Sequence, residues 1–241
     1  KININSIQKV SFGQKSTTCR MVLHLTNSFY SKVTSIDKTK SKIILTSSPQ
    51  KSKNQKTTVI TNRKRTSLRG KLIIIDPGHG GNDPGAVTKG NDFEKYYTLD
   101  ISKRIKKQLT SKGAKVILLR KNDTNPSLYQ RVKKINKLKG DFLVSVHINS
   151  FINSKANGTE TYYYKKQDKI AAKNIQKHMI KNLKLKNNGI KHARMYVLKY
   201  TKLPGVLIEP CFLTNSKEYK LLKTSHFREK IALSTVHGIE D

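Results

Sequence analysis

Hydrophobic and polar positions follow a regular alternation from Gly70 onward. Short apolar runs alternate there with segments in which apolar residues recur every four positions. The run Lys71–Asp76 (KLIIID) predicts a strand, and the segment after it carries an apolar stripe of helical spacing that ends before Gly113. The stripe consists of Tyr97, Ile101, Ile105 and Leu109.

The same alternation continues to the end of the chain. Further strands are predicted at Ala114–Arg120, Asp141–His147, Met195–Leu198 and Gly205–Glu209. Helices are predicted over Leu128–Ile135, around Lys169–Leu183 and over most of Ser216–Gly238. Apolar strands separated by helices are typical of an α/β fold, in which helices flank a twisted, mainly parallel or mixed sheet.

The first 69 residues have a different character. Residues 1–48 contain two β-rich runs, Arg20–Leu25 and Ser41–Thr46, and predict a small β segment, either a domain or part of one. Residues 49–69 carry seven basic residues and no acidic one among many Ser, Thr, Asn and Gln residues. This composition predicts a basic linker, although a tether that touches an anionic surface is the alternative. The third part, residues 70–241, is the predicted α/β domain.

The net charge of the chain limits the classes of binding partner that we expect. The chain has 49 Lys and Arg residues against 15 Asp and Glu residues, which gives a formal net charge of +34. Such a surplus favours polyanions, including anionic polymers of a cell envelope, although an A/T-rich genome would produce the same lysine bias. Lysines outnumber arginines 40 to 9. Because guanidinium is the better group for gripping phosphate, this ratio argues against a specific nucleic-acid partner.

The positions of the cysteines argue against a cysteine-based metal site, and the lengths of the apolar runs argue against a transmembrane helix. Cys19 and Cys211 are far apart and form no CxxC pair, so a metal site would have to use histidines and carboxylates. No apolar run approaches the about 20 residues that a transmembrane helix needs. No export signal is recognisable in this chain.

Four polar residues stand where predicted strands end or a helix begins. His79 follows the first strand after a short turn, His147 and Glu209 end later strands, and Glu94 opens the first helix. Ligands of open α/β sheets bind beyond the carboxyl ends of the strands, so we expect these residues to lie together. Two imidazoles and one carboxylate suit a catalytic zinc ion with water in its fourth position, and a second carboxylate can move protons.

Each of these residues also has an ordinary structural interpretation. Asn91 and Glu94 have the spacing of a helix capping box, which local pattern alone favours for Glu94. His79 could be a surface residue in a glycine-rich turn, and His147 could be a core histidine. Glu209 could be half of a partly buried ion pair. Their expected convergence at one sheet edge favours the functional interpretation.

At this point a family resemblance becomes visible. Residues 70–241 resemble the zinc-dependent N-acetylmuramoyl-L-alanine amidases of the amidase-3 type, which act in bacterial cell-wall turnover. The segments that carry the resemblance are IIIDPGHGGNDPGAV, NDFEKYYTLDISKRIKKQL, KVILLRKNDTNPSLYQRVKKIN, DFLVSVHINS, GTETYYY and YVLKYTKLPGVLIEPCFLTN.

The resemblance implies a set of residue roles and a reaction. His79, Glu94 and His147 would bind Zn²⁺, and Glu209 would be the catalytic carboxylate. A zinc-bound water would hydrolyse the amide between N-acetylmuramic acid and L-alanine in peptidoglycan, as in an autolysin or a cell-division hydrolase of the periplasm or cell wall. A zinc peptidase that cuts within the stem peptide and a non-catalytic wall- or polyanion-binding module are the alternatives.

Three details refine the resemblance. Cys211 follows Glu209 after a proline, where the family usually has a small residue; it could be buried, or its sulfur could reach the metal. Only a short stretch separates His147 from GTETYYY, so we expect an open site without the blocking helix of some family members. Residues 1–48 resemble the end of an AMIN domain, although a generic β fragment is the alternative.

Overall fold

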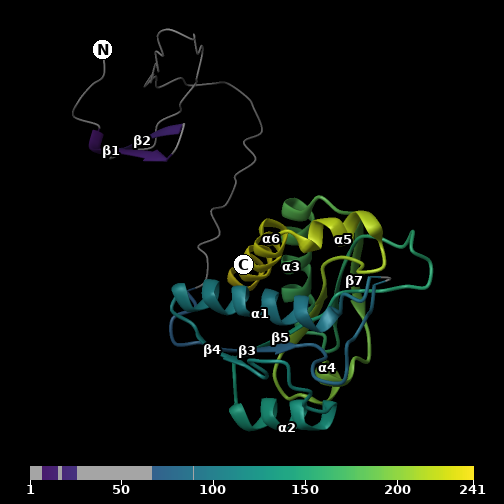
Figure 1. The fold of residues 1–241 in the computed structure, drawn as a ribbon. Helices are drawn as coiled ribbons and strands as arrows, with labels where there is room; N and C mark the ends of the chain where they lie inside the picture. The colour runs from purple at the N-terminus through teal and green to yellow at the C-terminus, as the bar shows by residue number, and fades with distance from the viewer. Residues whose placement is uncertain (1–6, 16–17, 26–66, 89) are drawn as a thin grey trace, which may run out of the picture. The chain divides into compact units, whose positions relative to one another are not determined.

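The structure is a computed structural model that describes residues 7–15, 18–25, 67–88 and 90–241. In the N-terminal part, the described residues form two antiparallel paired strands, β1 (Ile7–Lys15) and β2 (Thr18–Leu25) (Figure 1). The predicted strand at Arg20–Leu25 lies within β2 and is confirmed. The predicted strand at Ser41–Thr46 and most of the predicted linker lie outside the described residues.

A six-stranded sheet organises the larger part. Its strands are β3 (Leu72–Pro77), β4 (Lys115–Leu118), β5 (Phe142–Val146), β6 (Thr159–Tyr163), β7 (Asn187–His192) and β8 (Gly205–Glu209). Their order is β4-β3-β5-β8-β6-β7. The first four strands in this order run parallel, β6 runs antiparallel to β8, and β7 is parallel to β6. The sheet is therefore mixed, as expected.

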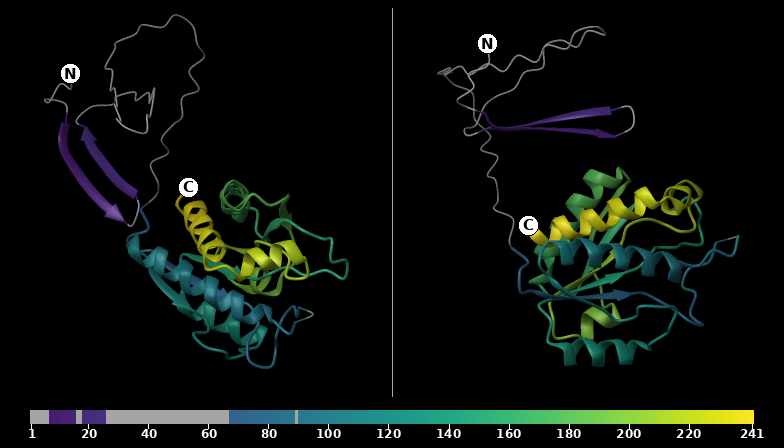
Figure 2. Two further views of the ribbon diagram at one scale, coloured as in Figure 1. Left: turned by 45° about the horizontal axis from the view of Figure 1, so that its top comes forward. Right: turned by 60° about the vertical axis from the view of Figure 1, so that its left-hand side comes forward.

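Helices cover both faces of this sheet (Figures 1 and 2). They are α1 (Glu94–Ser111), α2 (Leu128–Leu138), α3 (Asp168–Leu183), α4 (Tyr196–Tyr200), α5 (Ser216–Lys223) and α6 (Ser225–Glu240). The first, third, fifth and sixth helices lie over one face, and α2 and α4 lie over the other. Within the described residues, no helix is long and apolar enough to cross a membrane.

The two helical layers explain why the strands are apolar without interruption. Ile73 and Ile75 of β3 belong to the core beneath α1, α3 and α6, whereas Ile74 belongs to the core on the side of α2 and α4. Successive side chains of a strand point to opposite faces. A strand that is covered on both faces therefore carries a near-continuous apolar run, here Leu72–Ile75. Leu68, just before β3, is buried in the first of these cores.

One predicted strand is wrong. The segment Met195–Leu198 lies at the start of helix α4. Val197 and Leu198 are neighbours in sequence and are both buried in the same core, which alternating strand positions would not allow. A run of only four apolar residues does not separate a strand from a helical turn. The prediction also missed β6 (TETYY) and β7 (NNGIKH), because neither contains a continuous apolar run; β7 also lies at the sheet edge.

Candidate metal centre

The turn that carries His79 is held by two buried arginines. His79 follows β3 and has a left-handed backbone conformation, with φ of 58°. Arg120 donates hydrogen bonds to the carbonyl oxygens of Pro77 and Gly78. Arg131 donates to the carbonyl oxygens of Pro77 and His79, the latter at 2.8 Å. The arginines therefore fix a backbone shape that a non-glycine residue rarely adopts.

Two glycines leave room for the side chains of the predicted ligands. A Cβ atom on Gly78 would lie 2.4 Å from the ring of His147. A Cβ atom on Gly85 would lie 2.6 Å from Oε2 of Glu94 and 2.7 Å from the ring of His79. Both contacts are shorter than side-chain atoms tolerate, so the glycines are required by close approach.

Glu94 does not form the capping box that its spacing to Asn91 favoured. Helix α1 begins at Glu94 itself, and its N-cap, Phe93, makes no side-chain hydrogen bond. The carboxylate of Glu94 instead accepts hydrogen bonds from the backbone nitrogens of Ala86 and Ile148, each at 2.9 Å. Glu94 is only 4% exposed, so these bonds fix its orientation.

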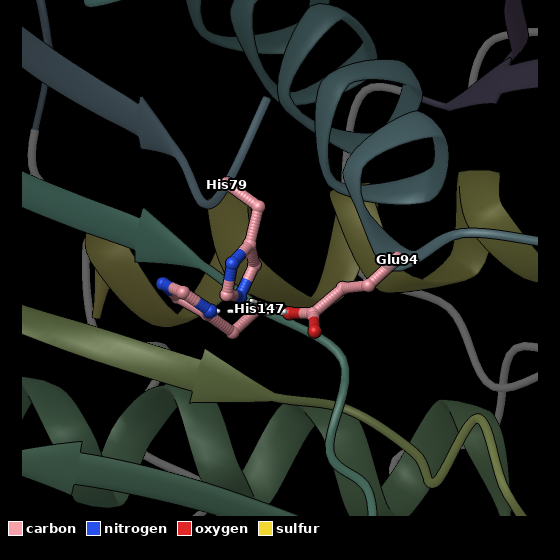
Figure 3. Close-up of side chains that lie close together, drawn as sticks. All are labelled: His79, Glu94 and His147. Atoms are coloured by element: carbon pink, nitrogen blue, oxygen red, sulfur yellow. Dashed lines mark hydrogen bonds and ion pairs between the residues drawn. The ribbon is translucent and has the colours of Figure 1, made fainter. Parts of the chain in front are cut away.

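The structure brings His79, Glu94 and His147 together (Figure 3). Nε2 of His79 lies 3.3 Å from Oε1 of Glu94, and Nδ1 of His147 lies 3.1 Å from the same oxygen. The two rings meet edge to face, with their centroids 4.8 Å apart. Ligand atoms around a tetrahedral zinc ion are separated by about 3.4 Å, given zinc–ligand distances of about 2.0–2.1 Å. The two separations from Oε1 of Glu94 are close to this value, and all three candidate ligand atoms lie within 4.8 Å of one another, so the group could hold a metal ion.

Asp83 is a site residue that sequence reasoning missed. Its Oδ2 lies 2.9 Å from Nδ1 of His79, and its Oδ1 accepts a hydrogen bond from the backbone nitrogen of Gly85. A carboxylate on one ring nitrogen fixes the tautomer and turns the other nitrogen toward the centre. Asp83 follows His79 by four residues in the same glycine-rich turn, and this was the available signal.

The ionised carboxylate of Glu94 and the imidazoles of His79 and His147 stabilise one another. Burial acts to raise the pKa of Glu94, but hydrogen bonds and charges of His147 and His79 lower the pKa well below its usual range. For His79, burial acts to lower the pKa, and Glu94 and Asp83 together raise it above 6.5. The carboxylate of Glu94 is thus held ionised between the two imidazoles, as a metal ligand must be.

Glu209 ends β8 beside this cluster. The backbone of β8 contacts the start of the loop after β5, because the backbone nitrogen of His147 donates to the oxygen of Ile208 at 3.1 Å. Oε2 of Glu209 is buried and has no hydrogen-bond partner among the described residues. Burial raises the pKa of Glu209 well above 4.5, and the charges of Glu94 and Glu160 raise it further. The alternative interpretation of Glu209, as half of a partly buried ion pair, is not seen in the described part of the chain.

A cavity opens beside the cluster. Its volume is about 450 Å³, and His79 and His147 form part of its wall together with Arg131 and Tyr196. The side chains of His79 and His147 remain 24% and 22% exposed. In the described residues the candidate centre is thus accessible, in line with the expectation of an open site.

Cys211 lies in the core rather than among the predicted ligands. It is fully buried, and burial raises the pKa of its thiol well above 9. Within the described residues, the group whose ligand atoms approach one another consists of His79, Glu94 and His147 only. Of the two interpretations of Cys211, the structure favours simple burial.

Comparisons with known proteins agree with this architecture. A family model described as N-acetylmuramoyl-L-alanine amidase matches residues 73–241. N-acetylmuramoyl-L-alanine amidase LytC of Bacillus subtilis is 39% identical over 185 residues, which cover 75% of this chain and 37% of LytC. The germination-specific N-acetylmuramoyl-L-alanine amidase of the same organism is 35% identical over 71% of this chain and 79% of its own length. This chain thus spans well under half of LytC.

Solved amidase structures share the fold. An N-acetylmuramoyl-L-alanine amidase from Clostridium difficile 630 superposes with a TM-score of 0.69 at 34% identity, over 72% of this chain and 96% of that one. The catalytic domain of CwlV from Bacillus (Paenibacillus) polymyxa gives 0.68 at 35% identity, over 70% and 96%. The family match begins at Ile73, so it lends no support to an AMIN domain in residues 1–48. Through residues 73–241, this chain belongs to the N-acetylmuramoyl-L-alanine amidase family.

Proposed function

We propose that this chain hydrolyses the amide bond between N-acetylmuramic acid and L-alanine in peptidoglycan. His79, Glu94 and His147 would hold a Zn²⁺ ion, and Glu209 would be the catalytic carboxylate. The observation that carries the proposal is the meeting of three ligand atoms from separate segments within 4.8 Å of one another. Family membership and the relatives' names support the choice of bond.

The donor set supports zinc in particular. Two imidazole nitrogens and one carboxylate oxygen are the ligands of many catalytic zinc sites, and such sites leave a fourth position open. When bound, an ion of this kind polarises a carbonyl and lowers the pKa of water to about 7. The exposed edges of His79 and His147 along the cavity leave space for a substrate carbonyl there.

Glu209 has the properties of a proton carrier. Its buried carboxylate has a raised pKa, which makes it a stronger base than an exposed glutamate. In the proposed reaction, Glu209 accepts a proton from the attacking water and passes it to the amide nitrogen. The products are the lactyl carboxylate and a stem peptide with a free N-terminal alanine.

Mass spectrometry of the products released from purified peptidoglycan tests the proposal. The wild-type chain should release stem peptides that begin with a free alanine amine. Glu209→Gln should abolish release, and it should still bind zinc as measured by metal analysis. His79→Ala should lose both activity and zinc, whereas His192→Ala is the matched control, because His192 lies outside the cluster and contacts Tyr164.

Other results would contradict the proposal. Fragments cut within the stem would indicate the zinc peptidase alternative, and intact peptidoglycan with bound protein would indicate a wall-binding module. Full activity after complete removal of metal would contradict the assignment of the three ligands. Activity of Glu209→Gln equal to wild type would remove Glu209 from the mechanism.

The remaining assignments belong to the same proposal. An enzyme with this substrate acts outside the cytoplasm, in the periplasm or cell wall. The division into a small β part at residues 1–48, a linker at 49–69 and a catalytic part at 70–241 stays a prediction, as does the AMIN resemblance.

A further inference from the structure

A second cavity lies at the C-terminal end of α3, outside the candidate metal centre. Its volume is about 670 Å³, and its wall is formed by the loop after β5, the connection between α3 and β7, and the start of α5. Four exposed lysines lie in this wall, and we call the cavity the basic groove. They are Lys155, Lys184, Lys186 and Lys217.

A row of exposed lysines runs along α3 toward the basic groove. The row consists of Lys169, Lys173, Lys177 and Lys181, all exposed. Residues four apart lie on one side of a helix and are separated by about 6 Å along its axis. Lys184 of the groove follows Lys181 by three residues, so the row leads into the groove.

The positive charge of this surface is hardly compensated. In the described part of the chain, the ammonium groups of the eight lysines form one ion pair, between Lys177 and Asp241 at 3.9 Å. The one carboxylate in the groove wall, Glu218, is 4% exposed and accepts hydrogen bonds from the backbone nitrogens of Gly158 and Phe212. Elsewhere acidic residues do pair with lysines, as in Lys71–Asp141.

The lysine row has a cost for the helix. Like charges four residues apart on one side of a helix destabilise it. Lys169 in the first turn also opposes the helix dipole. A bound polyanion would remove both penalties, because it would place negative charge between the lysines.

We propose that the basic groove and the lysine row together bind a linear phosphodiester polymer of sugar alcohols. Lysine presents a compact point charge, which suits a flexible chain of phosphates better than the planar recognition of a base. Among the described residues, the wall of the groove includes no aromatic side chain on which a nucleic-acid base could stack. The choice of a wall polymer over nucleic acid also rests on the proposed function, which places the protein at the cell wall.

Binding of purified poly(glycerol phosphate) to the full chain, measured by calorimetry at several salt concentrations, tests the proposal. The groove variant replaces Lys155, Lys184, Lys186 and Lys217 with Gln. The control variant replaces Lys103, Lys107, Lys133 and Lys137 with Gln; these are exposed lysines of α1 and α2, and the net charge changes equally. Gln keeps the helix propensity of Lys, and exposed substitutions of this kind change stability little.

The groove variant should bind at least tenfold more weakly than wild type, and the control should bind within twofold of wild type. Each lysine that contacts a phosphate contributes about 0.7 to the slope of log K against log[salt], as for single-stranded nucleic acid, so the groove variant should lose about 3 from that slope. Equal weakening of both variants, or of neither, would overturn the proposal.

Two further measurements distinguish this proposal from nucleic-acid binding and from the proposed hydrolysis. Single-stranded DNA with the same number of phosphates should bind at least tenfold more weakly than the polymer; equal binding would overturn the choice of occupant. Glu209→Gln should bind the polymer as wild type does, because the groove is distinct from the metal centre. Loss of hydrolysis with retained polymer binding would thus leave this inference standing, even if the proposed reaction failed.

Discussion

Gly85→Ala should disrupt the proposed metal site and leave the fold in place. Gly85 has φ of +66°, and an added Cβ would lie 2.6 Å from Oε2 of Glu94 and 2.7 Å from the ring of His79. Gly189→Ala is the matched control. Gly189 has a similar φ of +81°, but nothing lies within 4 Å of its added Cβ. The two variants share the backbone strain and differ in the contact with the ligands.

The magnitude follows from these distances. Ordinary contacts begin near 3.4 Å, so the atoms of Glu94 and His79 would have to move by about 0.8 Å in Gly85→Ala. Metal sites tolerate deviations of about 0.2 Å in ligand distance. We therefore expect zinc affinity to fall at least 10–100-fold, the range seen when ligand orientation is disturbed. The shared backbone strain costs about 1–2 kcal/mol in either variant, or roughly 2–8 °C in Tm.

Zinc affinity is measured by competition with a chromophoric chelator, and Tm is measured by circular dichroism in the presence of excess chelator. Gly189→Ala should lower Tm and leave zinc affinity unchanged, whereas Gly85→Ala should lower both. If Gly85→Ala bound zinc as tightly as Gly189→Ala, the side chains of Glu94 and His79 would have more space than the structure shows. The assignment of Glu94 and His79 to one ion would then be refuted.

Three further changes test other contacts of the site. Asp83→Ala should weaken zinc binding about 10–100-fold in the chelator competition, because the ring of His79 loses the carboxylate that orients it; unchanged affinity would contradict this role. Arg131→Met should lower the free energy of unfolding in urea by about 3–5 kcal/mol, because it leaves Asp76 buried without its partner; a loss below 1 kcal/mol would count against this. Cys211→Ala should keep wild-type zinc affinity and lower the free energy of unfolding by about 1 kcal/mol. Weaker zinc binding by this variant would indicate that the sulfur of Cys211 is a ligand.

The sheet and its main helices were predictable because the burial of each element leaves a clear pattern of apolar residues in the sequence. The strand Leu72–Pro77 lies under helices on either side, so every position from Leu72 to Ile75 is apolar, and the run stands out in the sequence. The helix Glu94–Ser111 is buried along one side only, and the apolar stripe in its sequence identifies that buried side. Short or polar elements such as α4 and β7 carry neither signal.

The contacts within the site were less predictable, because they depend on atoms that approach from distant segments. The capping-box pattern at Asn91 and Glu94 is local, and the long-range contacts of Glu94 with Ala86, Ile148 and the two histidines prevailed over it. Local spacing cannot reveal such competition. A tertiary contact that satisfies a buried carboxylate is worth more than the cap it replaces, since an unpaired buried charge is costly.

The convergence of the candidate site residues follows from the order of the strands rather than from the sequence spacing. His79, His147 and Glu209 follow or end β3, β5 and β8, which are consecutive neighbours in the sheet and run parallel. Adjacent strands are about 4.8 Å apart, so their ends bring the candidate side chains close together, as the proposed site requires. Had β6 inserted between β5 and β8, Glu209 would lie one strand farther from His147. Because β6 instead joins the far side of β8 in the antiparallel direction, it places Glu160 opposite Glu209, where its charge helps to raise the pKa of the proposed base.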